Sequence, residues 1–314
     1  MKNKTILVTG GAGFIGSNLV DELIKDGHGV HVIDNFSSGK KENCNEKAVY
    51  HNLDTSLIEN TDALRKIFEN VDTIFHCAAL ARVQPSIVDP LKYEVNNTLG
   101  LMNVLKAAAD IKVRRIIYSA SSSAYGPTEN LPSKESDPVN PISPYDNQKY
   151  YGELCCKMFS EVYGIETVSL RYFNVYGERQ NLGGAYATVV GVFIKQILDN
   201  QPLTINGTGM QRRDFTYVGD VVRANILASK SSKVRYGEII NIGSGKNVSI
   251  NSLADMIGGE KKYMNPVNEP FANLADISRA KELLDWEPLV EITSWIEEYK
   301  KKNRFKIAWV KKFL

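Results

Sequence analysis

Tyr145 and Lys149 are the two residues of this chain whose types and spacing best suit chemistry. They lie four residues apart and so share one face of a helix, and Pro144 is suited to be the first residue of that helix. A lysine ammonium near a phenol favours the phenolate and lowers its pKa from about 10 toward the working range of a general base. Taken alone, such a pair is most often an exposed helical pair, so the interpretation depends on what accompanies it.

Ser121 is the third candidate for catalysis. It follows the apolar run of residues 115–118, which predicts a buried strand, and so lies in the loop at the end of that strand. From there its hydroxyl can hydrogen-bond the same substrate hydroxyl that Tyr145 would deprotonate and hold it in position. We predict that Tyr145, Lys149 and Ser121 form the catalytic set.

Glycines between residues 10 and 16 predict the binding of a dinucleotide. Residues 5–9 form an apolar run typical of a buried strand, and residues 14–25 carry apolar side chains at helical spacing, so the glycines lie in a strand-to-helix turn. Glycine at 11, 13 and 16 satisfies the fingerprint that needs a tight turn, a backbone close to a pyrophosphate and close helix packing. The helix N-terminus then faces the phosphates.

Asp34 indicates which dinucleotide is bound. A second predicted strand, residues 30–33, ends at Asp34, about 20 residues after the glycines, where a carboxylate can accept hydrogen bonds from the adenosine ribose hydroxyls. A carboxylate would repel the 2′-phosphate of NADP, so Asp34 favours NAD, although Lys40 and Lys41 lie just downstream. The alternative, an ordinary glycine-rich turn, is disfavoured because strand, helix and acid are in register.

The alternation of elements predicts an α/β fold with a doubly wound parallel sheet of Rossmann type. In such a sheet the ligand lies at the carboxyl ends of the strands. We predict an NAD-binding domain of residues 1–172 and a smaller α/β substrate-binding domain formed mainly by residues 173–314, with some later segments free to return to the first domain. Besides the two strands already described, strands are expected at residues 48–50, 73–75, 115–118 and 167–170.

Composition limits the other functions open to the chain. Lys and Arg total 38 against 36 for Asp and Glu, so the net charge of +2 gives no reason to expect nucleic acid as a partner. Four cysteines and four histidines show no ligand spacing, and we predict no metal site. No stretch approaches about 18 apolar residues and the first strand begins almost at residue 1, so we expect no membrane partner and a cytoplasmic location.

The chain resembles the extended short-chain dehydrogenase/reductase family, and within it the nucleotide-sugar 4-epimerases typified by UDP-galactose 4-epimerase. The resemblance covers nearly the whole chain and is more specific for the family than for the reaction. It rests on residues 10–16, 34–35, 76–79, 118–126, 145–149, 171–174, 213–215 and 241–243.

The resemblance implies a tightly held NAD that is used and regenerated in each turnover. Tyr145 would take the proton of the sugar 4-hydroxyl while hydride passes from C4 to the nicotinamide, and the transient 4-keto sugar would rotate and accept hydride on its other face. The implied substrate is a UDP-sugar. The predicted cofactor contacts are Gly10, Gly13, Phe14, Ile15, Gly16, Asp34, Asn35, Asn52, Leu53, Ala78 and Lys149, and the predicted substrate contacts are Ser122, Ser123, Asn174, Arg213 and Asn273.

Other reactions on the same fold are alternatives. The resembling 4,6-dehydratases have Asp and Glu directly after the catalytic hydroxyl residue, whereas Ser122 and Ser123 stand in those places here, which leaves no evident acid and base to eliminate water. Decarboxylation of a nucleotide-uronic acid is similarly disfavoured. A UDP-glucuronate-type 4-epimerase stays open, and so does a catalytically silent NAD-binding protein, against which the intact catalytic set argues.

Two local resemblances favour an N-acetylated sugar. Aligning Ala275 and Asp276 with the family pattern puts Asn273 where a bulky tyrosine closes the pocket of hexose-restricted members, and the smaller asparagine would leave space for an N-acetyl group. Residues 184–187 also resemble the equivalent stretch of UDP-N-acetylglucosamine 4-epimerases. We expect UDP-N-acetylglucosamine and UDP-N-acetylgalactosamine as substrates, with UDP-glucose and UDP-galactose as further candidates.

Two departures from the family pattern affect binding. Residues 265–270 lack the arginine that many members use for the diphosphate, so anchoring relies more on Arg213. Asn52 stands where an aspartate is common near the adenine, with Asp54 two residues later, and the adenine contact falls to either of them.

A homodimer is expected as well. Resembling enzymes dimerise by pairing two helices into a bundle, although the same apolar residues would also suit the core of one subunit. On those two helices the apolar candidates are Leu154, Met158 and Phe159, and Leu101, Leu105 and Ala108.

Overall fold

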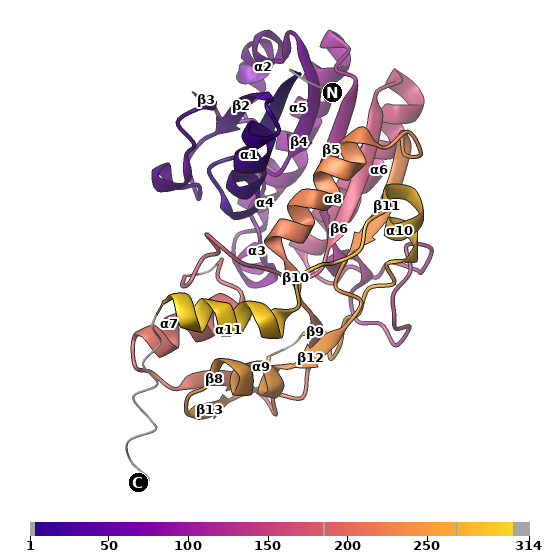
Figure 1. Cartoon of the computed structure of the whole chain (residues 1–314). Coiled ribbons are helices and arrows are strands. Elements are labelled where there is room, and N and C mark those ends of the chain that lie inside the picture. The colour runs from indigo at the N-terminus through magenta and orange to yellow at the C-terminus, as the bar shows by residue number, and fades with distance from the viewer. Residues whose placement is uncertain (1–3, 185, 268, 304–314) are drawn as a thin grey trace.

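The structure is a computed structural model that describes residues 4–184, 186–267 and 269–303. A larger lobe contains a seven-stranded sheet, and a smaller lobe lies at one end of that sheet (Figure 1). The strands of the sheet are β1 (Thr5–Thr9), β2 (Gly29–Asp34), β3 (Val49–Asn52), β4 (Val71–His76), β5 (Arg115–Ser121), β6 (Glu166–Tyr172) and β11 (Tyr236–Ile242).

The strands of this sheet are all parallel and lie in the order β3-β2-β1-β4-β5-β6-β11. The chain adds strands first on one side of β1 and then on the other, so the direction of winding reverses between β1 and β4. The carboxyl ends of these two strands therefore border the crevice where a sheet of this kind binds its ligand. The doubly wound α/β fold that the sequence predicts is confirmed.

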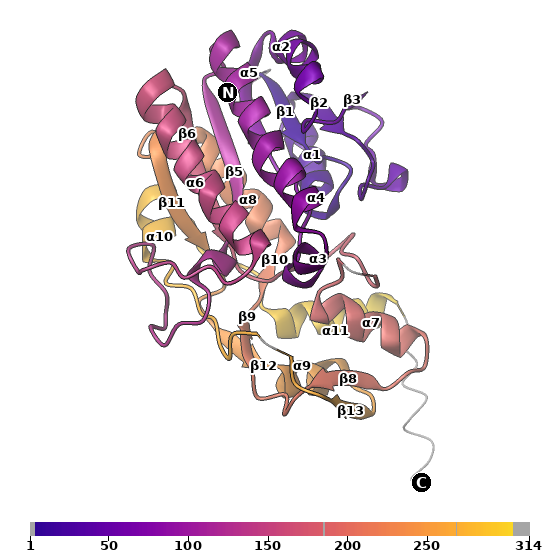
Figure 2. The ribbon, with the colours of Figure 1, turned by 180° about the vertical axis from the view of Figure 1, so that it is seen from behind.

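Helices cover both faces of the sheet. α1 and α8 pack on one face (Figure 1), and α2, α5 and α6 pack on the other (Figure 2). Because side chains alternate along a strand, Ile6 and Val8 of β1 join the core under α1 and α8, while Leu7 joins the core under α5. The helices are α1 (Phe14–Lys25), α2 (Thr61–Phe68), α3 (Val83–Val88), α4 (Pro90–Glu94), α5 (Gly100–Ile111), α6 (Pro144–Tyr163), α7 (Val189–Leu198), α8 (Val218–Lys230), α9 (Ile250–Ile257), α10 (Ser278–Leu284) and α11 (Ile292–Lys302).

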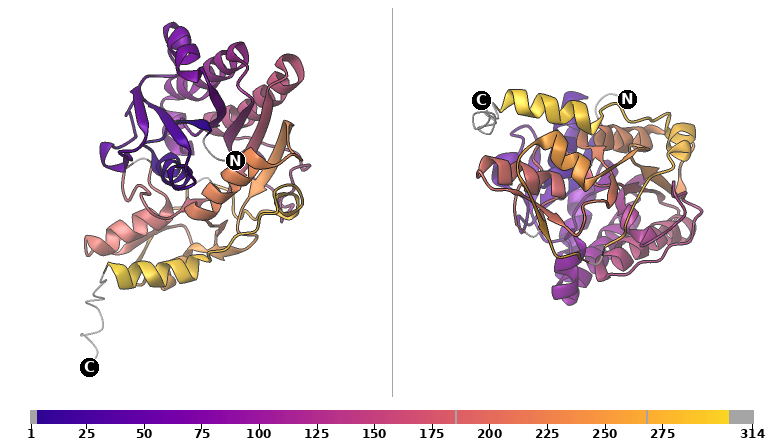
Figure 3. Two further views of the ribbon diagram at one scale, coloured as in Figure 1. Left: turned by 45° about the horizontal axis from the view of Figure 1, so that its top comes forward. Right: turned by 90° about the horizontal axis from the view of Figure 1, so that it is seen from below.

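The smaller lobe is built around its own apolar core. α7, α9 and α11 contribute Phe193, Leu253 and Trp295 to that core, and Figure 3 shows these salmon to yellow segments gathered at one end of the molecule. Short strands of the described chain pair two by two near the lobe: β7 (Val175–Tyr176) with β10 (Thr216–Tyr217), β9 (Arg212–Asp214) with β12 (Asn247–Ser249), and β8 (Leu203–Asn206) with β13 (Lys261–Met264).

Some of the described elements that follow residue 172 return to the larger lobe, namely β11, α8 and α10. β11 pairs with β6 at the edge of the sheet, and α8 packs beside α1. The chain therefore crosses between the lobes repeatedly, which ties their positions together. The division into residues 1–172 and 173–314 stays a prediction, and β11 and α8 are later segments of the kind that it left free to return.

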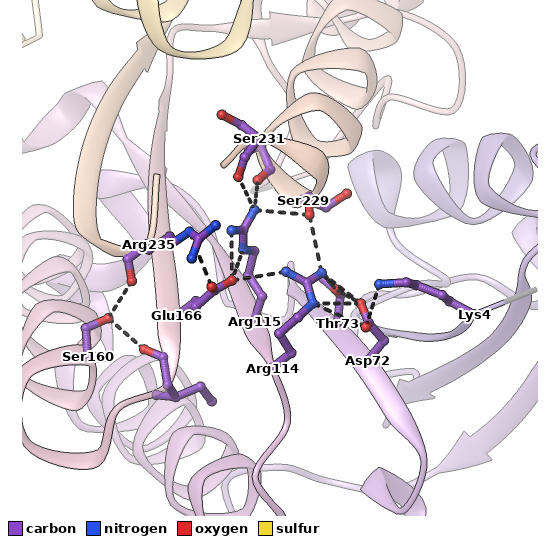
Figure 4. Close-up of polar contacts among 12 residues, drawn as sticks. Lys4, Asp72, Thr73, Arg114, Arg115, Ser160, Glu166, Ser229, Ser231 and Arg235 are labelled. Carbon is purple, nitrogen blue, oxygen red and sulfur yellow. Dashed lines mark hydrogen bonds and ion pairs between the residues drawn. The ribbon is translucent and has the colours of Figure 1, made fainter. Parts of the chain in front are cut away.

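Ion pairs fasten the amino ends of β4, β5 and β6 to one another (Figure 4). Arg114 donates to Asp72 at 2.8 Å and to Glu166 at 3.0 Å, and Arg115 donates to Glu166 at 2.8 Å. Arg115 is buried and also donates to the backbone carbonyls of Ala228, Ser229 and Ser231, at the end of α8. Since a buried guanidinium has lost its water, these partners are what make its charge tolerable. The charges at this end of the sheet are thus satisfied within the protein.

The helices of the described residues include none that is both long enough and apolar enough to cross a membrane.

Candidate active site

A cavity of about 680 Å³ lies at the carboxyl ends of β1, β4 and β5 and is also lined by segments of the smaller lobe. This is the edge of the sheet where the winding reverses, so the cavity occupies the crevice that the topology predicts. The predicted site residues that line the cavity are Gly10, Gly13, Phe14, Ile15, Gly16, Asp34, Asn35, Leu53, Ala78, Ser121, Ser122, Ser123, Tyr145, Lys149, Asn174, Arg213 and Asn273.

Asn52 does not line the cavity. It is the last residue of β3, and its side chain is exposed. The chain reaches the cavity with the next residues, Leu53 and Asp54, and Asp54 accepts a hydrogen bond from Asn35 Nδ2 at 2.9 Å. Of the two candidates for the adenine contact, the structure places Asp54 at the cavity and Asn52 away from it.

The glycine turn is shaped to hold a phosphate group. Gly10 has a φ of +69°, which favours glycine, and a Cβ on Gly16 would lie 2.2 Å from the carbonyl oxygen of Gly10. Gly13 is the N-cap of α1 and offers no side chain to its first amides, and it lines the cavity together with Phe14 and Ile15. A helix N-terminus with unsatisfied amides attracts an anion. The turn therefore fits the pyrophosphate of NAD.

Asp34 is held beside this turn at the end of β2. Its Oδ2 accepts a hydrogen bond from the Ala12 amide at 2.9 Å, and its Oδ1 accepts one from the Phe36 amide at 2.8 Å. Each carboxylate oxygen has a second lone pair, so both can still accept from ribose hydroxyls. The position and charge of Asp34 match the role predicted for it.

The start of α6 fixes the position of Tyr145. Pro144 is the first residue of the helix, and Ser143 Oγ caps it by accepting from the Asp146 amide at 3.2 Å. The Tyr145 amide donates to Ser86 Oγ of α3 at 3.2 Å. Tyr145 is thus in the first turn of a capped helix that is also fastened to α3, and its side chain lines the cavity.

Tyr145 lies next to Ser121 and Arg82. Burial raises the pKa of Tyr145 above its ordinary value, and Asp146 adds to this rise. A hydrogen bond with the Ser121 hydroxyl and the positive charge of Arg82 lower the pKa of Tyr145. The contact between Tyr145 and Ser121 is the one that the predicted catalytic set requires. Arg82 is therefore a cation that acts on the phenol and that the predicted catalytic set did not include.

Lys149 is directed toward the end of β5. Its Nζ donates to the Ser119 carbonyl oxygen at 2.7 Å and lies 5.1 Å from the centroid of the Tyr118 ring. Burial lowers the pKa of Lys149 to about 8, although Cys77 and Glu153 raise it. The ammonium therefore lines the cavity near the sheet edge, where the predicted contact with NAD is available to it.

The predicted substrate contacts Asn174 and Asn273 are hydrogen-bonded to each other. Asn273 Oδ1 accepts from Asn174 Nδ2 at 3.1 Å and from the Asp214 amide at 2.9 Å. Arg213, the neighbour of Asp214 on β9, pairs with Glu269 at 2.6 Å. Asn273 is thus a fixed, half-buried part of the cavity wall and not a solvent-facing loop residue.

Arg82 and Glu269 are among the cavity residues that were not predicted as site residues. Glu269 lies in the stretch 265–270, which lacks the arginine that many family members use for the diphosphate. Glu269 forms an ion pair with Arg213. Arg82 comes soon after the end of β4. Because ligands bind at the carboxyl ends of parallel strands, this position in the sequence could have indicated a cavity residue. Ala185 and Asn268, which belong to the predicted stretches 184–187 and 265–270, lie outside the described residues.

His76 is a packed residue at the end of β4. Its Nδ1 lies 2.9 Å from Thr9 Oγ1, and burial lowers the pKa of His76 to about 3, with a smaller effect of Lys149 in the same direction. The imidazole is therefore neutral at ordinary pH. In the part of the chain that the structure describes, no group of three or more His, Cys, Asp or Glu side chains is arranged to hold a metal ion.

The fold and the cavity define a dinucleotide-binding enzyme of the short-chain dehydrogenase/reductase type. The model of the NAD dependent epimerase/dehydratase family matches residues 6–243, and the chain belongs to this family. A protein of Methanocaldococcus jannaschii that is provisionally named a UDP-glucose 4-epimerase is 42% identical, over 93% of this chain and 96% of its own length.

Solved structures give the same result. A UDP-N-acetylglucosamine 4-epimerase from Methanobrevibacter ruminantium, in complex with UDP-N-acetylmuramic acid, is 39% identical over 96% of this chain and 98% of its own, with a TM-score of 0.89. A UDP-glucuronic acid 4-epimerase from Bacillus cereus, in complex with UDP-glucuronic acid and NAD, is 35% identical over 95% and 99% of the two chains, with a TM-score of 0.86. The predicted family and NAD cofactor are confirmed, and the chain is an NAD-dependent enzyme of the nucleotide-sugar epimerase class.

Replacing Tyr145 tests its role as the proton acceptor. Tyr145→Phe removes the phenolic oxygen and keeps the ring, so we expect turnover to fall by about 10²- to 10⁴-fold or more while NAD stays bound. The measurements are the rate of 4-epimer formation and the NAD released on denaturation. Tyr163→Phe, on the same helix but half exposed at its far end, should behave as the wild type. Tyr145→Phe activity close to that of the wild type would contradict the assignment.

Proposed function

We propose that this epimerase interconverts UDP-N-acetylglucosamine and UDP-N-acetylgalactosamine by inversion at C4 through a transient 4-keto sugar, and that it also accepts UDP-glucose and UDP-galactose. The observation that carries the proposal is the shared cavity. Tyr145 and its hydrogen-bond partner Ser121 line the same space as the glycine turn and Asp34, so the proton acceptor and the cofactor cradle serve one ligand-binding site.

Tyr145 and Ser121 provide the acid and base chemistry in this proposal. The substrate 4-hydroxyl donates to the Tyr145 oxygen, and Ser121, already beside that oxygen, orients the hydroxyl. Arg82 stabilises the phenolate form of Tyr145 that accepts this proton, because its positive charge lowers the pKa of Tyr145. Bound NAD supplies the hydride acceptor and donor that inversion at C4 requires.

Arg213 and Asn174 anchor the nucleotide. Arg213 lines the cavity and can bind a diphosphate through charge-assisted hydrogen bonds. The Glu269 carboxylate pairs with the guanidinium of Arg213 at 2.6 Å. A bound diphosphate must therefore share this guanidinium with Glu269 or displace Glu269 from it. Asn174 uses its Nδ2 for the Asp214 carbonyl oxygen and for Asn273, which leaves its Oδ1 to accept from the ligand.

Asn273 supports the choice of an N-acetylated sugar. Its side chain is held against Asn174 and the Asp214 amide, so it cannot swing into the cavity without losing two hydrogen bonds. A tyrosine at this position would extend farther into the cavity, and the asparagine leaves that space for an acetamido group. The relative from Methanobrevibacter ruminantium, which is named for UDP-N-acetylglucosamine, supports the same choice.

The proposal is tested by incubating the purified protein with UDP-N-acetylglucosamine and, separately, with UDP-glucose, without added NAD. Proton NMR follows the appearance of the 4-epimers. We expect product from both, with the larger kcat/KM for the acetylated sugar, because Asn273 leaves room for the acetamido group. Product from UDP-glucose alone would contradict the substrate assignment, and product from neither sugar would contradict the proposed activity.

Asn273→Tyr probes the space next to the sugar. The larger side chain should lower kcat/KM for UDP-N-acetylglucosamine by at least about tenfold more than for UDP-glucose, because steric exclusion discriminates between the two sugars. Asn273→Ala is the matched control, since it removes the same hydrogen bonds without adding bulk. If Asn273→Tyr reduces both activities equally, Asn273 is not the residue that selects the sugar.

We also propose that the enzyme is a homodimer that pairs through α6, and a cytoplasmic location stays a prediction. Tyr151, Leu154, Met158 and Val162 are exposed along one face of α6. The other residues considered for this face are core residues of one subunit, because strands and helices of the larger lobe cover them. They are Leu101, Leu105, Ala108 and Phe159.

Charge on that face of α6 should separate the subunits. Leu154→Glu combined with Met158→Glu places two charges on an apolar interface, and we expect the mass measured by light scattering at micromolar concentration to halve. Leu289→Glu, at an exposed leucine in the loop before α11, should leave the mass unchanged. A wild-type protein that scatters as a monomer would contradict the proposed dimer.

A further inference from the structure

Arg82 is a positively charged cavity residue whose backbone is strained. It directly precedes α3 and lines the cavity together with Tyr145. Its φ is +87°, in a region that residues other than glycine rarely adopt. The fold therefore holds an arginine at a position where glycine would be less strained. We infer that an interaction of the guanidinium offsets the free energy of this backbone strain.

In the part of the chain that the structure describes, the surroundings of Arg82 contain hydroxyl and carbonyl groups but no carboxylate partner. Its Nε donates to the Tyr186 carbonyl oxygen at 3.2 Å, and the phenols of Tyr145 and Tyr93 are its electrostatic neighbours. Among the described residues no Asp or Glu forms an ion pair with Arg82. Burial, the largest influence on it, lowers the pKa of the Arg82 guanidinium.

Two other arginines of the cavity wall show the contrast. Arg213 pairs with Glu269 at 2.6 Å, and Arg179 pairs with Asp21 at 2.7 Å. Both charges are thus balanced within the protein, whereas no described acidic residue balances that of Arg82. A partly buried guanidinium without an anion is costly, and its planar fork matches a carboxylate. While Tyr145 is protonated, the cavity reaches charge balance at Arg82 only when a ligand supplies an anion.

The position of Arg82 indicates which part of the ligand carries that anion. The glycine turn is the cradle for the cofactor pyrophosphate, and Arg213 is the anchor for the substrate diphosphate. Arg82 instead directly precedes α3, whose Ser86 accepts from the Tyr145 amide at 3.2 Å, and it lines the cavity together with Tyr145, which meets the sugar 4-hydroxyl in the proposed reaction. The substituents nearest to a 4-hydroxyl are those on C3 and C5 of the ring. An anion at Arg82 is therefore part of the sugar and not of either diphosphate.

We propose that Arg82 binds a carboxylate on C5 of the substrate sugar, so that the preferred substrates are UDP-hexuronic acids, above all those that also carry a 2-acetamido group. This inference rests on the proposed 4-epimerisation of a UDP-sugar and ranks UDP-hexuronic acids ahead of the neutral sugars named above as its substrates. Asn273 and Arg82 then recognise different substituents of one sugar. Arg82 is a specificity-determining residue, and its carboxylate partner comes with the substrate.

Two matched pairs of sugars test the proposal. UDP-N-acetylglucosaminuronic acid is compared with UDP-N-acetylglucosamine, and UDP-glucuronic acid with UDP-glucose, since the members of each pair differ only at C6. We expect the wild type to show the larger kcat/KM for the acid of each pair. Arg82→Gln should lower kcat/KM for the acids by about 10- to 100-fold more than for the neutral sugars, as expected for losing a hydrogen-bonded charge pair.

Variants with matched chemistry separate charge from shape. Arg82→Lys keeps the charge and should recover part of the preference for the acids. Arg65→Gln removes an arginine of α2 that pairs with Asp62 and Asp110 and does not line the cavity, so its preference should equal that of the wild type. Bound NAD is measured for each variant after denaturation.

The outcomes separate this inference from the proposed function. Turnover of the neutral sugars with rejection of both acids would overturn the role of Arg82 and leave 4-epimerisation intact. Equal losses for acids and neutral sugars in Arg82→Gln, or loss of its NAD, would also overturn the inference, because Arg82 would then serve only Tyr145 or the cofactor. If no sugar is turned over, calorimetry decides: tighter binding of UDP-glucuronic acid than of UDP-glucose that Arg82→Gln abolishes supports the inference, and equal binding overturns it.

Discussion

The close approach of α1 to the end of β1 is the constraint on which the rest of the site depends. A side chain at Gly16 would collide with the Gly10 carbonyl oxygen, and one at Gly10 would collide with the backbone of Ala78, so the turn exists only with glycine at both positions. This packing points the start of α1 at the crevice between β1 and β4. The glycine turn, Asp34 and segments of the smaller lobe all line the cavity at this crevice.

Burial and charge oppose each other within the cavity. Burial makes proton loss from Tyr145 harder and lowers the pKa of Lys149, while Ser121 and Arg82 make proton loss from Tyr145 easier. Arg213 is balanced by Glu269, and Arg82 has no such partner among the described residues. The cavity is therefore prepared for anionic ligands at more than one place, and its proton acceptor depends on a neighbouring cation.

Several groups of site residues could be predicted from local sequence, because the members of each group lie on one helix or in one turn. Tyr145 and Lys149 share a capped helix, and the glycines share one turn, so spacing alone predicted that each group would face one way. Where a shift of two residues decided the outcome, spacing was not enough. Asn52 ends β3, is exposed and does not line the cavity, while Asp54 does. Apolar residues on α5 and α6 were equally ambiguous, since core and interface have the same composition.

The sequence by itself determined the doubly wound sheet, the dinucleotide turn and the choice of NAD, because strand and helix periodicity and a carboxylate at the end of β2 are local properties. Only the tertiary structure decided which cation lies beside Tyr145, since Arg82 and Tyr145 are far apart in the chain and meet where α3 packs on α6. It likewise decided that Glu269 holds Arg213 and that Asn273 is fixed by Asn174. Such contacts join segments from different parts of the chain, and the local sequence pattern of one segment does not indicate which other segment packs against it.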